Sequence, residues 1–143
     1  MSAYADTSFL VSLYTPDVNS PAAARFMKHA ELPLAITPLG ELELMNALQL
    51  RVFRKELSAG KVRAAAALFR KDLAAGILAI RPLSAPVFER AKHLARTRTA
   101  NLGTRTLDLL HVASAVVLQS DFFYSFDRHQ LQSARAEGLT LPK

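Results

Sequence analysis

Four carboxylates stand at positions where the sequence could carry out chemistry. Asp6, in YADTSFLVSLY, ends a short apolar run, and Asp127 directly follows the apolar run FFYSF. Asp108 lies in the first turn of the apolar segment TLDLLHVASAVVL, and Glu43 lies in PLGELELMNALQL. Carboxylates gathered at one site repel one another unless something neutralises them. Hard divalent cations do so with oxygen ligands and suit phosphodiester hydrolysis.

Each of these acids also has a purely structural interpretation. Asp6 and Asp127 precede helix-like segments and are good N-caps, whereas the helix dipole favours Asp108 in a first turn. Taken alone, Asp6 is better explained as a cap, although one of its oxygens could cap while the other faces a cation. Glu41 and Glu43 are two residues apart, so on a helix they point about 200° apart. Only one of the two can face a shared site.

The strands and helices that position these acids can be predicted from short apolar runs and from prolines at the starts of helices. Short apolar runs predict buried strands, and helical patterns separate them. Strands that alternate with helices predict an α/β fold in which ligands bind beyond the carboxyl ends of the strands. Besides the run before Asp6, the predicted strands are Leu34–Ile36, Leu78–Ile80, Phe122–Phe126 and a weaker Leu139–Leu141. The predicted helices include Pro38–Lys55, Ser58–Ala75, Pro86–Thr99 and Leu107–Gln119, with further starts near Thr7, at NSP (19–21) and near Arg128.

Composition narrows the functional classes. The 143 residues suit one domain, expected over residues 1–143. Cysteine is absent, which excludes disulfides, zinc–thiolate sites and a thiol nucleophile and is compatible with the cytoplasm. No apolar run is long enough to span a membrane, and no secretion signal is evident. The net charge of +6 favours a polyanionic partner such as nucleic acid, although a solvated basic surface gives the same count.

Other side chains give weaker signals. Glycine-rich phosphate loops and a G-x-S-x-G elbow are absent. The histidines form no ligand spacing, and His111 is expected to be packed and hydrogen-bonded rather than catalytic. The remaining acids are expected at the surface; they are Asp17, Glu31, Glu56, Asp72, Glu89, Asp121 and Glu137.

Four segments in this order resemble a known family. YADTSFLVSLY, ELELMNAL, TLDLLHVASA and FFYSFDRHQLQSA, which together cover nearly the whole chain, resemble the PIN domain and more closely its VapC-type toxins. The resemblance implies a three-layer α/β/α sandwich around a mainly parallel sheet. It also implies a ribonuclease dependent on Mg²⁺ or Mn²⁺.

The site residues implied by the resemblance are the same four carboxylates. They are Asp6, Glu43, Asp108 and Asp127, all as catalytic and metal-binding groups. LMNAL after Glu43 matches the family better than the alternative register, which would place Glu41 in the site. Thr7 and Ser8 are expected to contact a metal-bound water or a phosphate, or else to cap the first helix. Arg105 is expected to touch a phosphate or to be solvated.

Partners and alternatives complete the sequence-based hypothesis. RNA is the expected substrate, a small antitoxin the expected protein partner, and a homodimer the expected assembly. The apolar stretch Leu39–Phe53 and the helix Ser58–Ala75 are candidates for the antitoxin groove, and an ordinary amphipathic surface is equally compatible. The rival hypotheses are a PIN-like binding module without turnover, an RNA-processing nuclease outside a toxin–antitoxin pair, and a phosphohydrolase that acts on small phosphate esters.

Overall fold

Four short parallel strands form the centre of the computed structural model, which describes residues 2–143. The strand order is β3-β2-β1-β4, so β1 lies in the interior of the sheet with β2 and β4 on either side. All three strand pairs are parallel, as predicted. The strands are β1 (Ala3–Ala5), β2 (Leu34–Ile36), β3 (Leu78–Ile80) and β4 (Phe122–Tyr124).

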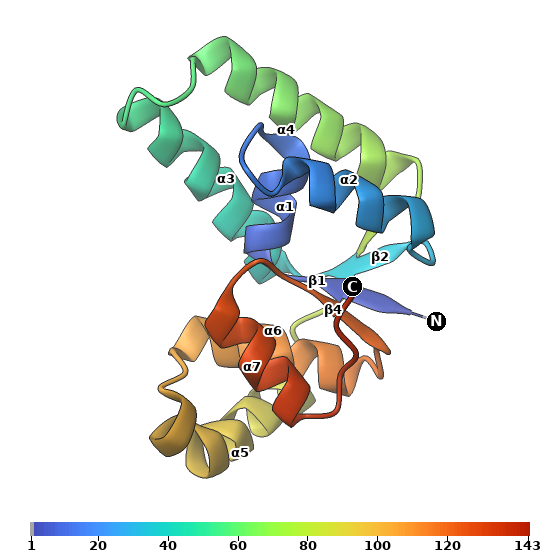
Figure 1. Cartoon of the computed structure of the whole chain (residues 1–143), viewed down its shortest axis with the longest axis vertical. Coiled ribbons are helices and arrows are strands. Elements are labelled where there is room, and N and C mark those ends of the chain that lie inside the picture. Colours follow the sequence, from blue (N-terminus) through green and yellow to red (C-terminus); the bar gives the residue numbers. More distant parts are fainter. Residues whose placement is uncertain (1) are drawn as a thin grey trace.

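Helices cover both faces of this sheet and make three layers (Figure 1). The helices α1, α2, α3 and α4 pack on one face around Phe9, Leu10 and Phe69, and the helices α5, α6 and α7 pack on the other around Val112 and Phe123. The predicted α/β/α sandwich is thereby confirmed. The helices are α1 (Thr7–Tyr14), α2 (Ser20–His29), α3 (Pro38–Phe53), α4 (Ala59–Ala74), α5 (Ala85–Leu102), α6 (Thr106–Val117) and α7 (Arg128–Ala136).

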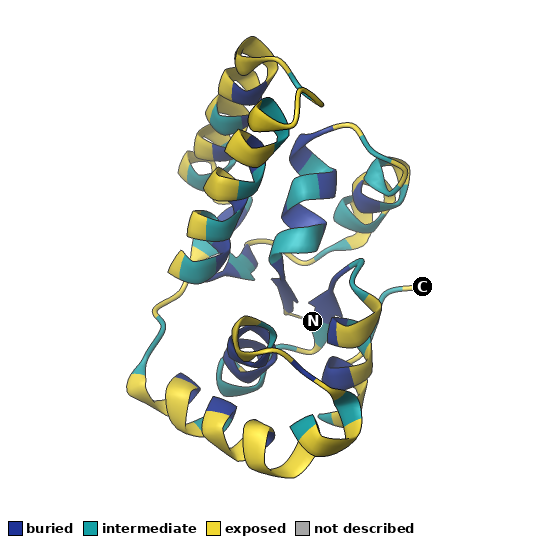
Figure 2. Cartoon of the chain, turned by 90° about the vertical axis from the view of Figure 1, so that its left-hand side faces the viewer, coloured by how far each residue is buried: buried dark blue, intermediate teal, exposed yellow. Residues whose placement is uncertain are grey.

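The burial of the elements explains why their sequences differ. The strands lie between the two helical layers and are largely buried, whereas α4 and α5 expose one long side (Figure 2). Strands covered on both faces must be apolar throughout, which is why LAI occurs in both β2 and β3. α6 carries a run of seven consecutive buried residues, Leu109–Ala115, so it is a core helix. Because Asp108 immediately precedes this run, the core helix fixes its position.

The strand register brings the first and last acidic motifs together. Ala5 of β1 pairs with Tyr124 of β4, so Asp6 and Ser125 are the next residues of neighbouring strands. The backbone N–H of Asp6 donates to the carbonyl of Tyr124 at 3.1 Å. Residues that are far apart in the sequence therefore meet at the carboxyl edge of the sheet, as expected for a parallel α/β fold.

Two sequence predictions near the end of the described chain need correction. Leu139–Leu141 forms no full strand; it makes a single parallel bridge, between Thr140 and Phe122. Glu137 is not a surface residue, because its side chain is only 6% exposed and pairs with Arg90 at 2.9 Å and Arg98 at 3.0 Å. A carboxylate with two arginine partners tolerates burial, and both partners come from α5, which is distant in the sequence.

Candidate active site

A small acidic cavity lies where β1 and β4 pass into α1 and α7. Its volume is about 160 Å³. All four predicted carboxylates line it, together with Thr7, Ser8 and Arg105; Glu41 does not. The complete lining is Asp6, Thr7, Ser8, Glu43, Arg105, Asp108, His111, Asp127 and Gln130.

Asp6 is held at the base of the cavity by three hydrogen bonds. It is 2% exposed. Its Oδ1 accepts from the Ser8 hydroxyl at 2.7 Å and from the backbone N–H of Phe9 at 3.1 Å, while Oδ2 accepts from the Ser125 hydroxyl at 2.5 Å. Asp6 therefore caps α1 and lines the cavity at the same time. Burial raises the pKa of the Asp6 carboxyl, and the bonds from Ser125 and Ser8 offset only part of that rise.

Ser125 is a site residue that the sequence analysis did not single out. Its hydroxyl oxygen donates to Asp6 and accepts the backbone N–H of Asp127 at 3.0 Å. One hydroxyl thus connects the two aspartates that follow β1 and β4. The sequence signal was its place between a buried strand and an acid, but a serine there is as common in ordinary turns.

Glu43 projects from α3 and is held by two donors on the same oxygen. Its Oε1 accepts from the Thr7 hydroxyl at 2.8 Å and from His111 Nε2 at 2.6 Å. Within residues 2–143 the other oxygen, Oε2, makes no hydrogen bond. Burial acts to raise the pKa of Glu43, but the bonds from His111 and Thr7 outweigh it and hold the pKa below its ordinary value.

Glu43 and Tyr4 hold the two ring nitrogens of His111, and Glu43 determines which one carries the proton. His111 is buried, and its Nδ1 lies 2.7 Å from the Tyr4 hydroxyl. Because an ionised Glu43 can only accept, Nε2 carries the hydrogen, and in the neutral ring Nδ1 accepts from Tyr4. Burial raises the pKa of Tyr4, which keeps this donor protonated. The expectation of a packed, hydrogen-bonded His111 is confirmed, and its contact with Glu43 is new.

The other half of the cavity is more exposed. Asp108 Oδ2 accepts from Arg105 Nε at 3.1 Å, and Arg105 Nη2 lies 3.9 Å from Asp127 Oδ2. Asp127 Oδ1 accepts the backbone N–H groups of His129 and Gln130 and so caps α7. The Arg105 side chain is 75% exposed. Within residues 2–143 no other cationic side chain pairs with either of these acids.

Gln130 completes the lining with an unsatisfied buried acceptor. It is 2% exposed, and its side-chain Oε1 has no hydrogen-bond partner among residues 2–143. A buried polar atom without a protein partner normally bonds an ordered water or an ion. Gln130 lines the acidic cavity, but Oε1 itself has almost no accessible surface, so a water in the cavity does not reach it.

The donor set fits a hard divalent cation. Four carboxylates share the cavity with Arg105, and oxygen ligands without sulfur are those that Mg²⁺ and Mn²⁺ prefer. Within residues 2–143 no three histidine, aspartate or glutamate side chains already stand as a coordinating group. Each carboxylate accepts a bond from a protein donor, so an ion would replace some of these bonds or bind the oxygens that they leave free, such as Glu43 Oε2.

The parallel sheet, its two helical layers and the acidic cavity at the strand ends define an α/β domain with a candidate hydrolase site. The chain belongs to the PIN domain family, whose model matches residues 3–136. No curated protein sequence matches the chain closely enough to count as a relative.

Several solved structures share this fold, among them the following two. One is VapC20 of Mycobacterium tuberculosis, described as a sarcin-ricin loop cleaving toxin, with a TM-score of 0.73 and 18% identity over 97% of each chain. The other is VapBC2 of Rickettsia felis, bound to a DNA fragment from its promoter, with a TM-score of 0.67 and 19% identity over 99% of this chain and 98% of that one. At this level of identity the likeness shows the fold.

Proposed function

We propose that this chain is a metal-dependent endoribonuclease and the toxin of a toxin–antitoxin pair. The observation that carries the proposal is the convergence of four carboxylates, from α3, α6 and two strand ends, on one cavity of a PIN domain. The similarity in fold to VapC20 and VapBC2 supports the toxin assignment. Residues 1–143 would form a single nuclease domain, acting in the cytoplasm where its substrates are.

The residues of the cavity have separate roles in this proposal. Asp6 and Asp108 would hold the ion, and Asp127 and Glu43 would contribute directly or through waters. Bound Mg²⁺ or Mn²⁺ would lower the pKa of water and neutralise charge on the phosphate. Glu43 or Asp127 would orient the attacking water.

The phosphate contacts fall to residues at the rim of the cavity. Arg105 would turn from Asp108 to a phosphate oxygen, since its exposed side chain is free to move. Thr7 donates to Glu43 and so positions that carboxylate. In-line attack on phosphorus would leave a 5′-phosphate and a 3′-hydroxyl. The ribose 2′-hydroxyl takes no part in this chemistry, so RNA is proposed as the substrate on the family likeness.

Cleavage of a mixed RNA pool with Mg²⁺ or Mn²⁺ tests the proposal. Asp6→Asn and Asp108→Asn should abolish cleavage, and Glu43→Gln should reduce it strongly. Glu41→Gln is the matched control, because Glu41 lies on the same helix outside the cavity and should cleave at the wild-type rate. Hydrolysis of a generic phosphate monoester in preference to RNA would favour a small-ester phosphohydrolase, and tight RNA binding without turnover would favour a binding module.

An apolar groove beside the cavity supports the antitoxin proposal. The groove, of about 600 Å³, is lined by Leu39, Leu42, Leu50 and Leu107 among others, and it shares Thr7 and Glu43 with the acidic cavity. A partner segment lying in it would reach the carboxylates with a basic side chain. Leu42 is 63% exposed, and exposed apolar groups of this kind mark interaction surfaces.

Two measurements test the proposed partners. The product of a small reading frame immediately upstream should bind this chain and inhibit cleavage, and Leu42→Lys should weaken that binding. Light scattering should give the mass of a homodimer. A chain with no such neighbouring frame, but with specific cleavage of a precursor RNA, would instead be an RNA-processing nuclease.

A further inference from the structure

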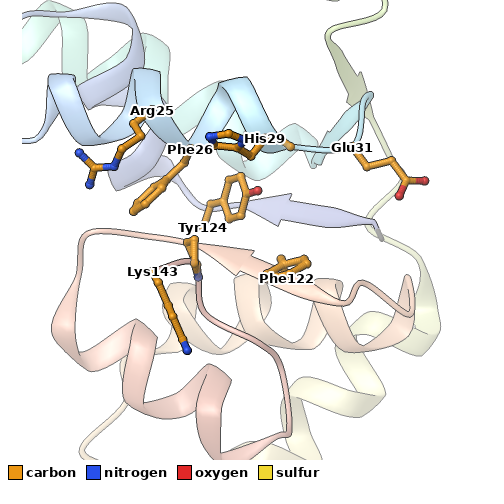
Figure 3. A pocket seen from close by; sticks show the side chains of 9 residues that line it. Arg25, Phe26, His29, Glu31, Phe122, Tyr124 and Lys143 are labelled. Atoms are coloured by element: carbon orange, nitrogen blue, oxygen red, sulfur yellow. The ribbon is translucent and has the colours of Figure 1, made fainter.

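A second and larger cavity lies away from the acidic site. Its volume is about 600 Å³, and it shares no lining residue with the acidic cavity. It opens between α2, the edge strand β4 and the C-terminal residues (Figure 3). Nothing in the proposed hydrolysis uses it. The lining residues that matter here are Arg25, Phe26, His29, Phe122, Tyr124 and Lys143.

Three aromatic rings form the apolar part of this cavity. The ring centroids of Phe26 and Tyr124 are 6.0 Å apart, and those of Phe122 and Tyr124 are 6.3 Å apart. Tyr124 is almost fully buried, while Phe26 and Phe122 keep part of their surface open to solvent. Partly open rings that line a cavity are stacking platforms for the faces of flat ligands, and nucleobases stack on such rings whatever their identity.

Cationic groups surround one end of the rings. The Arg25 guanidinium carbon lies 5.3 Å from the Phe26 ring centroid. Figure 3 shows Arg25 and Lys143 at the end of the cavity toward which β4 runs, and Glu31 at the opposite end. Arg25 and Lys143 are exposed. An aromatic floor with positive charge at one end matches a base and its phosphate rather than a neutral apolar ligand.

The aromatic rings continue from this cavity toward the acidic site. Phe126 stacks on Phe26 with ring centroids 6.2 Å apart and planes at 17°. Its backbone N–H donates to the Ser8 hydroxyl at 2.9 Å, and Asp127 follows it in the chain. Tyr124 and Asp127 are three residues apart in a chain that turns after β4, so their Cα atoms are separated by at most roughly 10 Å. That distance corresponds to about three stacked nucleotides of one strand.

We propose that the cavity between α2 and β4 binds a base of a single-stranded RNA segment that flanks the cleaved bond. Arg25 turns from the face of Phe26 to an adjacent phosphate, which Lys143 also contacts. The base stacks on Phe26 and Phe122, and the strand continues past Phe126 to the carboxylates. The net charge of +6 favours the same polyanion. This inference rests on the proposed function for the identity of the substrate, but RNA binding can be measured without cleavage.

Binding is tested with a fluorescent 12-nucleotide RNA and the cleavage-deficient Asp108→Asn chain. Arg25→Gln should weaken binding several-fold and reduce the slope of log affinity against log salt by about 0.7, the value for one phosphate contact to a single strand. Arg63→Gln is the matched control, because Arg63 is an exposed arginine of α4 outside this cavity, and it should leave the slope unchanged. Equal effects of the two substitutions would overturn the proposal.

The stacking contact is tested by Phe26→Leu. Loss of one base–aromatic stack is expected to weaken binding about 5- to 100-fold. Because Phe26 also packs against the core, photo-crosslinking of wild-type chain to 4-thiouridine RNA provides a measurement that does not depend on the variant folding. Crosslinks on residues 25–31 or 122–126 are expected. Crosslinks found only elsewhere would overturn the proposal. Variants that alter self-association or antitoxin binding but not RNA affinity would also overturn it and would assign the cavity to a protein partner.

Cleavage kinetics separate this inference from the proposed function. With intact carboxylates, Arg25→Gln should raise KM for the 12-nucleotide RNA several-fold, whereas Arg63→Gln, outside the cavity, should leave KM unchanged. If no RNA is cleaved at all but Arg25→Gln still weakens RNA binding, the nuclease proposal fails and the RNA site stands. If RNA is cleaved but Arg25→Gln leaves RNA affinity unchanged, the RNA site fails and the nuclease proposal stands.

Discussion

Tyr4 provides the sharpest test of the network beneath the candidate site, and Tyr4→Phe is the perturbation. Tyr4 is fully buried, and its hydroxyl lies 2.7 Å from His111 Nδ1 and 3.4 Å from the Thr37 hydroxyl. Phenylalanine keeps the ring and its stacking on Phe123 but leaves Nδ1 without a donor in a buried position. An unsatisfied buried acceptor costs about 1–3 kcal/mol.

Urea unfolding followed by circular dichroism measures this loss. For a chain of 143 residues, the same free energy corresponds to a fall in Tm of about 3–10 °C. Tyr124→Phe is the matched control, because the hydroxyl of Tyr124 has no hydrogen bond within residues 2–143. Its effect on the free energy of unfolding should stay within about 0.5 kcal/mol.

Two further results bear on the same network. Nitrogen-15 NMR should find the His111 proton on Nε2, and a double-mutant cycle with His111→Gln should give a coupling free energy near 1 kcal/mol with Tyr4→Phe. If Tyr4→Phe costs no more than Tyr124→Phe, or if the proton is on Nδ1 alone, the hydrogen-bond chain from Tyr4 to Glu43 is wrong.

Three other predictions concern charge. Asp6→Asn should raise the stability of the metal-free chain at neutral pH, because burial raises the pKa of Asp6 and the folded state bears the cost of its charge. That cost is lost as the pH falls through the raised pKa, so thermal melts in EDTA should show that the gain in stability shrinks toward acid pH. A gain that does not change with pH would contradict this cause. Glu137→Ala should cost about 2 kcal/mol in urea unfolding because it removes the partner of two arginines, whereas Glu89→Ala, which breaks an exposed pair, should cost less than about 0.5 kcal/mol. Arg105→Gln should raise Mn²⁺ affinity about 2- to 5-fold in calorimetry without RNA, because it removes a competing cation from an exposed pair; weaker binding would mean that Arg105 supports the ligands instead.

Local sequence patterns predicted most of the fold. Leu34–Ile36 and Leu78–Ile80 are strands with the predicted bounds, because a short apolar run buried on both faces has few alternatives. Thr37 caps α3 by accepting the backbone N–H of Gly40, as the proline after it indicated. The strand Phe122–Phe126 was predicted two residues too long, because at Ser125 the chain turns to bond Asp6 instead of continuing the sheet.

The sequence predicted which residues form the site better than it predicted the contacts among them. The four carboxylates share one cavity, and Glu43 rather than Glu41 faces it; their roles as ligands stay a prediction. Two contacts could not be predicted: the hydrogen bond of Ser125 with Asp6 and that of Tyr4 with His111. Each joins residues more than 100 positions apart. The burial of Glu137 was missed for a similar reason, since its partners lie on another helix.

The four carboxylates are unequally anchored, and this has a consequence for how the protein is handled. Asp6 and Glu43 are fixed by buried hydroxyl and imidazole donors that belong to the core, while Asp108 pairs with a solvent-facing arginine. Such a chain is expected to complete its folding with half of the pocket already set, and the proposed ion would bind afterwards. Under the proposed metal dependence, chelation should therefore stop cleavage and leave the fold intact, so a stock prepared and stored in EDTA should cleave RNA again as soon as the cation is returned.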